Sequence, residues 1–271
     1  MVDDTKVTIG IIGGCLAAQP GIPHSKLYHK RLIKLLDEGM GIEVGIVLAK
    51  DSHSSYTDRL AGLLQRRQLD AVLLHIRPTT CHMKRQCLVT MPGGGKSGRI
   101  INPLLLRRSG ESWHSRKGHS TTDAAGRGVG YDHGAISPRR RGLMVLNCLL
   151  GVLLGAHRLA LRNERHLVKE MHTACKREGI QLYILGPTPA RMTPLDDWIC
   201  RSASQSIEAL AKELGIAYTA YHDLLTPEHK HMLNADMLHL TEDGHEHMAK
   251  VLYQLFQEEP LGMDGRWRSQ G

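Results

Sequence analysis

Residues 7–20 of the chain have the sequence VTIGIIGGCLAAQP, and this stretch decides the predicted fold. Residues 7–12 are a short apolar run, which near an N-terminus is typical of a fully buried first strand. Gly13 and Gly14 break the run, and Cys15 follows them. Glycines let the backbone turn freely, and open α/β sheets bind ligands at the carboxyl ends of their strands. Cys15 is therefore a candidate nucleophile; the alternative is a small buried side chain in a tight turn.

The length and composition are those of one large α/β domain or two small ones. With 271 residues the chain can bury a sizeable core, which aliphatic side chains must fill because aromatic residues make up only 4%. Residues 1–6 lack the basic and apolar regions of a secretory signal. The cysteines form no C-x-x-C pair, so we expect a cytoplasmic protein without a disulfide framework. The six are Cys15, Cys81, Cys87, Cys148, Cys175 and Cys200.

The first eighty residues alternate between strand and helix patterns. Apolar side chains at helical spacing predict a helix that Ser25 caps and that Gly39 or Gly41 ends. Such alternation in so short a length indicates βαβ crossovers and a parallel sheet. After the first strand, the predicted elements are a helix at 25–38, a strand at 42–48, a helix at 56–68 and a strand at 70–76.

The segment 79–141 differs from the rest in being rich in Gly, Arg, Ser and His. Residues 84–141 hold twelve Lys and Arg against three Asp and Glu, which accounts for the whole net charge of +8. A long irregular connection is typical of a lid, a binding loop or a disordered insertion. Basic segments attract anionic substrates or nucleic acid. We expect a solvated insertion or lid here and no nucleic-acid partner. Residues 90–97 resemble a phosphate-binding loop but begin with Thr90 instead of glycine, so no nucleotide cofactor is predicted.

The second part of the chain continues the α/β pattern. Residues 143–154 are almost entirely apolar, but Asn147 and the charges after His157 keep the run below the roughly 20 residues that a membrane span needs. We therefore expect no membrane span. Residues 1–258 are predicted to form a single domain, and residues 259–271 a polar tail. The predicted elements are a helix at 142–179, a strand at 181–185, a helix at 198–214, a strand at 216–219 and a helix at 241–257.

Residues 234–245, NADMLHLTEDGH, are the most informative run near the C-terminus. Asp236 and His239 are three residues apart, just before the last predicted helix. A carboxylate on one ring nitrogen of a histidine fixes its tautomer and makes the other nitrogen a better base. Placed after the last strand, His239 is expected to reach over the sheet to the end of the first strand.

These two blocks resemble those of the SGNH (GDSL-like) hydrolase superfamily. The Gly-Asp-Ser block after the first strand is matched by Gly13, Gly14 and Cys15, and the Asp-x-x-His block by Asp236 and His239. The resemblance extends over the chain except 79–141. It implies a three-layer α/β/α sandwich around a parallel sheet of about five strands. It also implies hydrolysis or transfer of ester, thioester or acyl groups.

Several positions differ from the superfamily pattern. The aspartate of the first block is Gly14, and the nucleophile is Cys15 instead of serine. The second-block glycine, an oxyanion donor, has no clear match, and Ser54 or Ser55 occupies that loop. By position, Arg77 replaces the third-block asparagine. The resemblance thus implies Gly14, Ser54 and Arg77 as oxyanion or substrate-binding residues.

The main hypothesis is an SGNH-like hydrolase or acyltransferase that acts on a small, anionic ester or acyl substrate without a cofactor. Cys15 would attack the carbonyl, His239 would act as base and Asp236 would orient it. One alternative is a catalytically inactive SGNH-like binding protein. Another is a zinc site among the histidines at 229–247, although a solvated histidine-rich surface also explains them. The sequence does not determine the acyl group, the acceptor or the oligomeric state.

Overall fold

The structure is a computed structural model that describes 6–13, 19, 21–49, 56–76, 155–187, 194–220, 224, 231–234 and 239–259, with single positions at 138–153. Its five strands form one parallel sheet in the order β2-β1-β3-β4-β5. The strands are β1 Lys6–Ile12, β2 Glu43–Leu48, β3 Ala71–His75, β4 Gln181–Leu185 and β5 Ala217–Thr219. The helices are η2 His24–Lys26 (3-10), α1 Tyr28–Met40, α2 Tyr56–Leu64, α5 Ala156–Arg177, α6 Pro194–Leu214 and α8 Glu242–Glu258.

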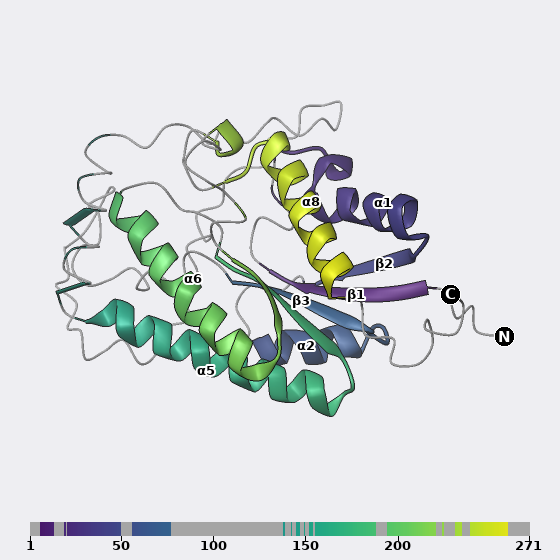
Figure 1. Ribbon diagram of the computed structural model, residues 1–271, viewed down its shortest axis with the longest axis horizontal. Coiled ribbons are helices and arrows are strands. Elements are labelled where there is room, and N and C mark those ends of the chain that lie inside the picture. Colours follow the sequence, from purple (N-terminus) through teal and green to yellow (C-terminus); the bar gives the residue numbers. More distant parts are fainter. Residues whose placement is uncertain are drawn as a thin grey trace, which may run out of the picture.

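Helices cover both faces of the sheet, so the molecule has three layers (Figure 1). α1 and α8 pack on one face, and α2, α5 and α6 pack on the other. The predicted α/β/α sandwich with a five-stranded parallel sheet is therefore confirmed. β3 and β4 are neighbours in the sheet although residues 79–141 lie between them in sequence.

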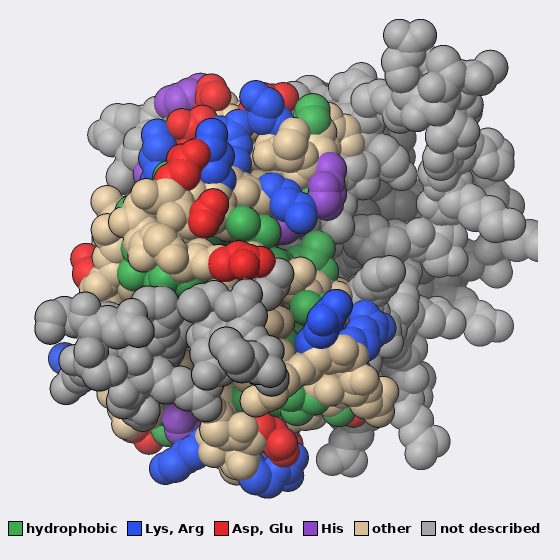
Figure 2. Space-filling model, turned by 90° about the vertical axis from the view of Figure 1, so that its right-hand side faces the viewer, with side chains coloured by type: hydrophobic (Ala, Val, Ile, Leu, Met, Phe, Trp, Pro, Cys, Tyr) green, Lys and Arg blue, Asp and Glu red, His purple; other side chains and the backbone are tan. Residues whose placement is uncertain are grey.

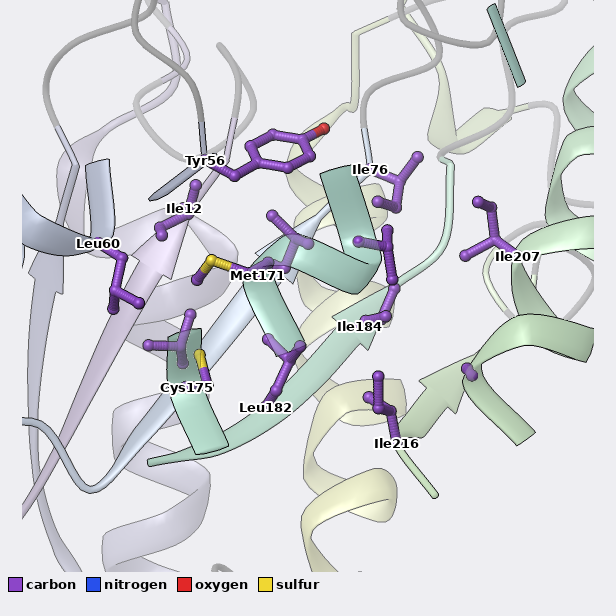
Figure 3. Packing of buried hydrophobic residues seen from close by; sticks show 14 of the residues in the cluster. Ile12, Tyr56, Leu60, Ile76, Met171, Cys175, Leu182, Ile184, Ile207 and Ile216 are labelled. Carbon is purple, nitrogen blue, oxygen red and sulfur yellow. The ribbon is translucent and has the colours of Figure 1, made fainter. Parts of the chain in front are cut away.

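Alternation of side chains along the strands explains the two cores. Ile11 points to the α1–α8 face, whereas Ile12 points to the α2–α5–α6 face, and both are at most 1% exposed. Because successive strand side chains point to opposite faces, a continuous apolar run is buried on both sides. On the second face, Met171 and Cys175 of α5 pack against Leu182 of β4 (Figure 3).

α1 and α8 lie side by side and approach closely at one glycine. A Cβ atom added to Gly39 of α1 would overlap the hydroxyl group of Tyr253 on α8. On the face drawn in Figure 2, basic and acidic side chains of the described residues are intermixed. Lys34 pairs with Glu38 on α1 at 3.6 Å. The described helix surface is therefore mixed in charge, unlike the segment 79–141.

Several predicted helix boundaries are wrong. α2 ends at Leu64 and not at 68, and α6 begins at Pro194 and not at 198. Ser25 lies in η2 and is not the N-cap of α1, which begins at Tyr28. The long predicted helix 142–179 is not continuous, because Gly155 has a φ of 67° and α5 begins after it. Gly41 does end α1, in the left-handed conformation that favours glycine. No helix in the described part of the chain combines the length and the apolar character that crossing a membrane requires.

Candidate active site

The topological switch point of the sheet lies at the carboxyl ends of β1 and β3. β2 lies on one side of β1 and β3 lies on the other, so the direction in which successive strands are added to the sheet reverses between β1 and β3. Open α/β sheets bind ligands at such a switch point. Gly13 follows β1 there, and Ile76 follows β3, with its N–H bonded to the carbonyl of Leu185 on β4 at 2.9 Å. The predicted nucleophile turn starts directly after Gly13.

Of the predicted site residues, the structure describes His239. It lies partly buried, directly before Leu240, in the segment that leads into α8. The other five lie outside the described residues, and their assignments stay predictions. They are Gly14, Cys15, Ser54, Arg77 and Asp236.

Hydrogen bonds hold both ends of the loop that contains the Asp-x-x-His block. The N–H of Asn234 donates to the carbonyl of His239 at 2.7 Å, and Leu233 and Leu240 form an antiparallel bridge. The N–H of Thr241 donates to the carbonyl of Met232 at 2.9 Å. Residues 235–238 therefore connect two backbone segments that are bonded to each other.

The first turn of α8 lies against the same segment. Thr241 is its N-cap, and the Thr241 hydroxyl accepts a bond from the N–H of Gly244 at 3.3 Å. A Cβ atom on Gly244 would collide with the carbonyl oxygen of Met232. α8 can thus begin close to residues 231–234 only because a glycine faces them.

Gln19, seven positions after the end of β1 in the sequence, is bonded to the segment of His239. Its side chain is 2% exposed. The Gln19 Nε2 donates to the carbonyl of Leu240 at 2.7 Å, and the Gln19 Oε1 accepts from the N–H of Leu240 at 3.3 Å. The side-chain amide of Gln19 thus bonds both the N–H and the carbonyl of Leu240, as the backbone of a neighbouring strand does. Two segments more than two hundred residues apart in sequence are joined next to His239.

His245, in the first turn of α8, completes this arrangement. Its Nδ1 accepts a bond from the N–H of Tyr28 at 3.3 Å, so the ring proton is on Nε2, which donates to Gln19 Oε1 at 3.3 Å. The ring is fully buried and stacks on Tyr28 at 6.0 Å between centroids. Burial, together with Arg31, His29 and His239, lowers the pKa of His245 to about 4. At neutral pH the ring is therefore neutral and its tautomer is fixed.

The bond between the Tyr28 N–H and His245 Nδ1 also gives a partner to the first N–H group of α1. Tyr28 is its first residue, and the first N–H groups of a helix lack intrahelical partners. The N-cap residue Leu27 offers no side-chain acceptor. His245 supplies that acceptor from α8, so the cap expected from Ser25 comes from a distant part of the chain. Local sequence carries no sign of such a cap.

The two described cysteines belong to the core and not to this site. Cys175 and Cys200 are at most 1% exposed. Burial raises the pKa of the Cys175 thiol to about 12, which leaves it protonated at neutral pH. Thiolates are the nucleophilic form of cysteine. We therefore expect no nucleophilic chemistry from Cys175.

Two other features of the described residues lie apart from this edge. A groove of about 770 Å³ runs between α2 and α5 and is lined by Thr57, His166 and Lys169, among others, but by none of the predicted site residues. Among the described residues, no group of three or more His, Cys, Asp and Glu side chains is arranged to hold a metal ion. Of the histidines considered for zinc, His245 uses both ring nitrogens in the hydrogen bonds above.

Sequence reasoning did not identify Gln19 or the role of His245. Gln19 stands between Ala18 and Pro20 in the sequence, where a polar residue carries no periodic signal. In the sequence, His245 stands out only as one of several neighbouring histidines. The link between them depends on contacts across more than two hundred residues, which a single sequence does not display.

Comparison with known proteins supports the fold. No protein-family model and no curated protein matches the chain. Among solved structures, the lipase Lip_vut3 from a goat rumen metagenome has a TM-score of 0.56 at 13% identity, covering 92% of this chain and 97% of that one. A lipolytic protein of the G-D-S-L family from Veillonella parvula has a TM-score of 0.53 at 12% identity, covering 93% and 98%. A lipase/acylhydrolase from Enterococcus faecalis has a TM-score of 0.51 at 12% identity, covering 93% and 96%.

Proposed function

We propose that this chain, which has the α/β/α fold of SGNH (GDSL-like) esterases and lipases, hydrolyses or transfers acyl groups with Cys15 as its nucleophile. His239 is the general base and Asp236 orients it. The substrate is a small ester, thioester or acyl compound. The observation that carries the proposal is the pairing of Gln19 with Leu240, because it joins the turn that follows β1 to the loop of His239.

Chain lengths support this assignment on both sides of that contact. Cys15 and Gln19 are four positions apart in the sequence, and an extended chain spans about 3.3–3.6 Å per residue, so their Cα atoms lie no more than about 14 Å apart. Cys15 is also two residues from Gly13, at the carboxyl end of β1. His239 is adjacent to Leu240. Both functional groups are therefore tied by short lengths of chain to the contact between Gln19 and Leu240.

The loop around Asp236 supports its role in orienting His239. Asp236 belongs to the four residues between Asn234 and His239, whose backbone groups are bonded at 2.7 Å. A loop so short keeps its members near one another. A carboxylate bonded to one imidazole nitrogen stabilises the imidazolium that forms during catalysis.

The reaction proceeds in two steps. His239 takes the proton of the Cys15 thiol as the sulfur attacks the carbonyl carbon, and the imidazolium then protonates the leaving alcohol or thiol as its bond breaks. The acyl group remains on sulfur as a thioester. Water or another acceptor, deprotonated by His239, attacks that thioester and releases the acyl product and the free thiol. A thiol with a pKa of about 8.5 is more easily activated than a hydroxyl.

The negative oxygen of the intermediate needs hydrogen-bond donors. We assign this role to the backbone N–H groups of Gly14 and Cys15, with Ser54 from the loop after β2 and Arg77 after β3. Removing one such donor typically raises the barrier by about 2.7–4 kcal/mol. An arginine also binds carboxylate or phosphate in a bidentate manner. Together with the basic segment 84–141, Arg77 favours an anionic substrate.

Hydrolysis of short-chain p-nitrophenyl esters and thioesters tests the assignment. We expect Cys15→Ala and His239→Ala each to lower kcat by ~10³-fold or more, because each removes a group that acts in the reaction. Cys175→Ala and His166→Ala are the matched controls, since Cys175 lies in the core and His166 on the exposed side of α5. Full activity in Cys15→Ala would contradict the nucleophile assignment.

The altered superfamily positions support one other function, that of a binding protein that has lost catalysis. Gly14 replaces an acid and Arg77 replaces an amide of the superfamily pattern. This alternative predicts no hydrolysis of any panel member. It also predicts that iodoacetamide alkylates Cys15 no faster than a free cysteine at neutral pH, whereas a thiol activated by His239 reacts faster.

A further inference from the structure

The side chain of Gln19 has a hydrogen-bond pattern that admits a single orientation. Its Oε1 accepts from the N–H of Leu240 and from His245, and its Nε2 donates to the carbonyl of Leu240. Exchanging oxygen and nitrogen would place donor against donor at both the Leu240 N–H and His245. A buried amide left unpaired costs about 1–3 kcal/mol. The amide is therefore held by its partners in one position.

Those partners are themselves fixed. The carbonyl of Leu240 also accepts a bond from the Nδ2 of Asn234 at 2.9 Å, so its direction is set from two sides. The ring of His245 is oriented by the N–H of Tyr28 and by stacking on the Tyr28 ring. Both α1 and α8 thus hold the ring against Gln19. Leu240 and His245 therefore orient the side chain of Gln19 from the part of the chain that contains the start of α8.

We propose that Gln19, braced by His245, is a positioning residue that holds the turn carrying Cys15 against the loop carrying His239. The inference rests on the proposed function, since it assigns a purpose to the contact between those two segments. Gln19 does not touch the reacting atoms. It acts by fixing the separation between two groups that come from opposite ends of the chain.

The kinetic consequence follows from geometry. A displacement of about 1 Å between reacting groups can cost about 10²-fold in rate. We expect Gln19→Met, which keeps the length but removes every polar contact, to lower kcat by roughly 10- to 100-fold with KM changed by no more than about threefold. Gln257→Met is the matched control, because Gln257 is exposed on α8 and its Nε2 donates to the Tyr253 hydroxyl at 3.1 Å.

Disulfide trapping tests the positioning without requiring catalysis. In His239→Cys, oxidised glutathione can join the Cys15 thiol to the introduced thiol, while glutathione disulfide is reduced to two glutathione molecules. Peptide mapping by mass spectrometry separates this product from disulfides of the other cysteines. We expect rapid trapping in His239→Cys and at least about a tenfold slower reaction when Gln19→Met is added, while Gln257→Met leaves the rate unchanged.

A second variant separates the loss of positioning from a loss of folding. Gln19→Glu keeps the shape and both acceptor contacts but cannot donate to the Leu240 carbonyl, so we expect slower trapping in a protein whose circular dichroism is that of the parent. Unchanged trapping in both Gln19 variants would overturn the positioning role, and so would absence of trapping in His239→Cys alone. The failure of the proposed function gives a different result. In that case trapping is rapid in His239→Cys and slowed by Gln19→Met, but the Cys15→Ala variant retains full activity.

Discussion

At the scale of single residues, His245 determines how the start of α1, the start of α8 and Gln19 fit together. The neutral ring accepts at Nδ1 and donates at Nε2, and each bond has a partner of the required kind. A protonated ring would present a second donor to the N–H of Tyr28. Arg31, His29 and His239 are the cationic or titratable neighbours that, after burial, oppose that proton. The contact is therefore suited to neutral pH.

The pH dependence of the unfolding free energy tests whether the His245 ring is neutral in the folded protein. The folded-state pKa of His245 is about 4, below the ordinary 6.5, so the unfolded chain binds a proton as pH falls through 6.5 while the folded chain does not. Stability from this residue is complete above pH 6.5 and is lost toward pH 4. We expect the fall in unfolding free energy between pH 7 and pH 5 to be smaller by about 2 kcal/mol in His245→Gln than in the parent.

Urea unfolding at the two pH values gives these free energies. His29, whose pKa burial also lowers to about 4, is present in both proteins and so cancels in the difference. The same substitution at exposed His166 controls for the loss of a histidine as such. An equal fall in unfolding free energy in the parent and in His245→Gln would contradict the buried neutral ring.

At the scale of elements, the contact of α1 with α8 depends on the missing side chain at Gly39. We expect Gly39→Ala to lower the unfolding free energy by about 1–3 kcal/mol, because the added methyl group meets the Tyr253 hydroxyl. Gly62→Ala on α2 is the matched control. Nothing lies within 4 Å of a Cβ atom there, so the change should raise stability by roughly 0.5–1 kcal/mol.

Chemical denaturation of the two variants and of Gly39→Ala with Tyr253→Phe measures these effects. Removing the hydroxyl makes room for the methyl group, so the double variant should recover part of the loss. If Gly39→Ala were as stable as Gly62→Ala, the close approach of the two helices would be wrong.

The elements also show what local sequence can predict. The strand at Gln181–Leu185 has the bounds predicted from its apolar run, and Gly41 ends α1 as its position indicates. Both signals are local. The start of α1 was predicted wrongly at Ser25, because its cap comes from His245, more than two hundred residues away. The predicted helix 142–179 is interrupted at Gly155, whose positive φ the surrounding apolar residues do not indicate.

At the scale of the molecule, both halves of the chain build one sheet. β1, β2 and β3 precede residues 79–141 and β4 and β5 follow them, yet β3 pairs with β4. We propose on this basis that residues 1–258 form one domain with 79–141 as a basic insertion. The sequence predicted this sheet, whereas most residues of the two predicted site blocks lie outside the described residues and stay predictions. It did not predict the pairing of Gln19 with Leu240, because that pairing leaves no pattern in either segment.

The proposed function depends on Cys15 forming a covalent acyl intermediate with the help of His239. Rapid-quench intact-mass analysis with a short-chain acyl thioester, followed by peptide mapping, measures this directly. We predict one added acyl group per chain, located on Cys15, absent in Cys15→Ala and strongly reduced in His239→Ala, with the buried Cys175 unmodified. An acyl group on any other residue, or none on Cys15 while substrate is turned over, would contradict the account.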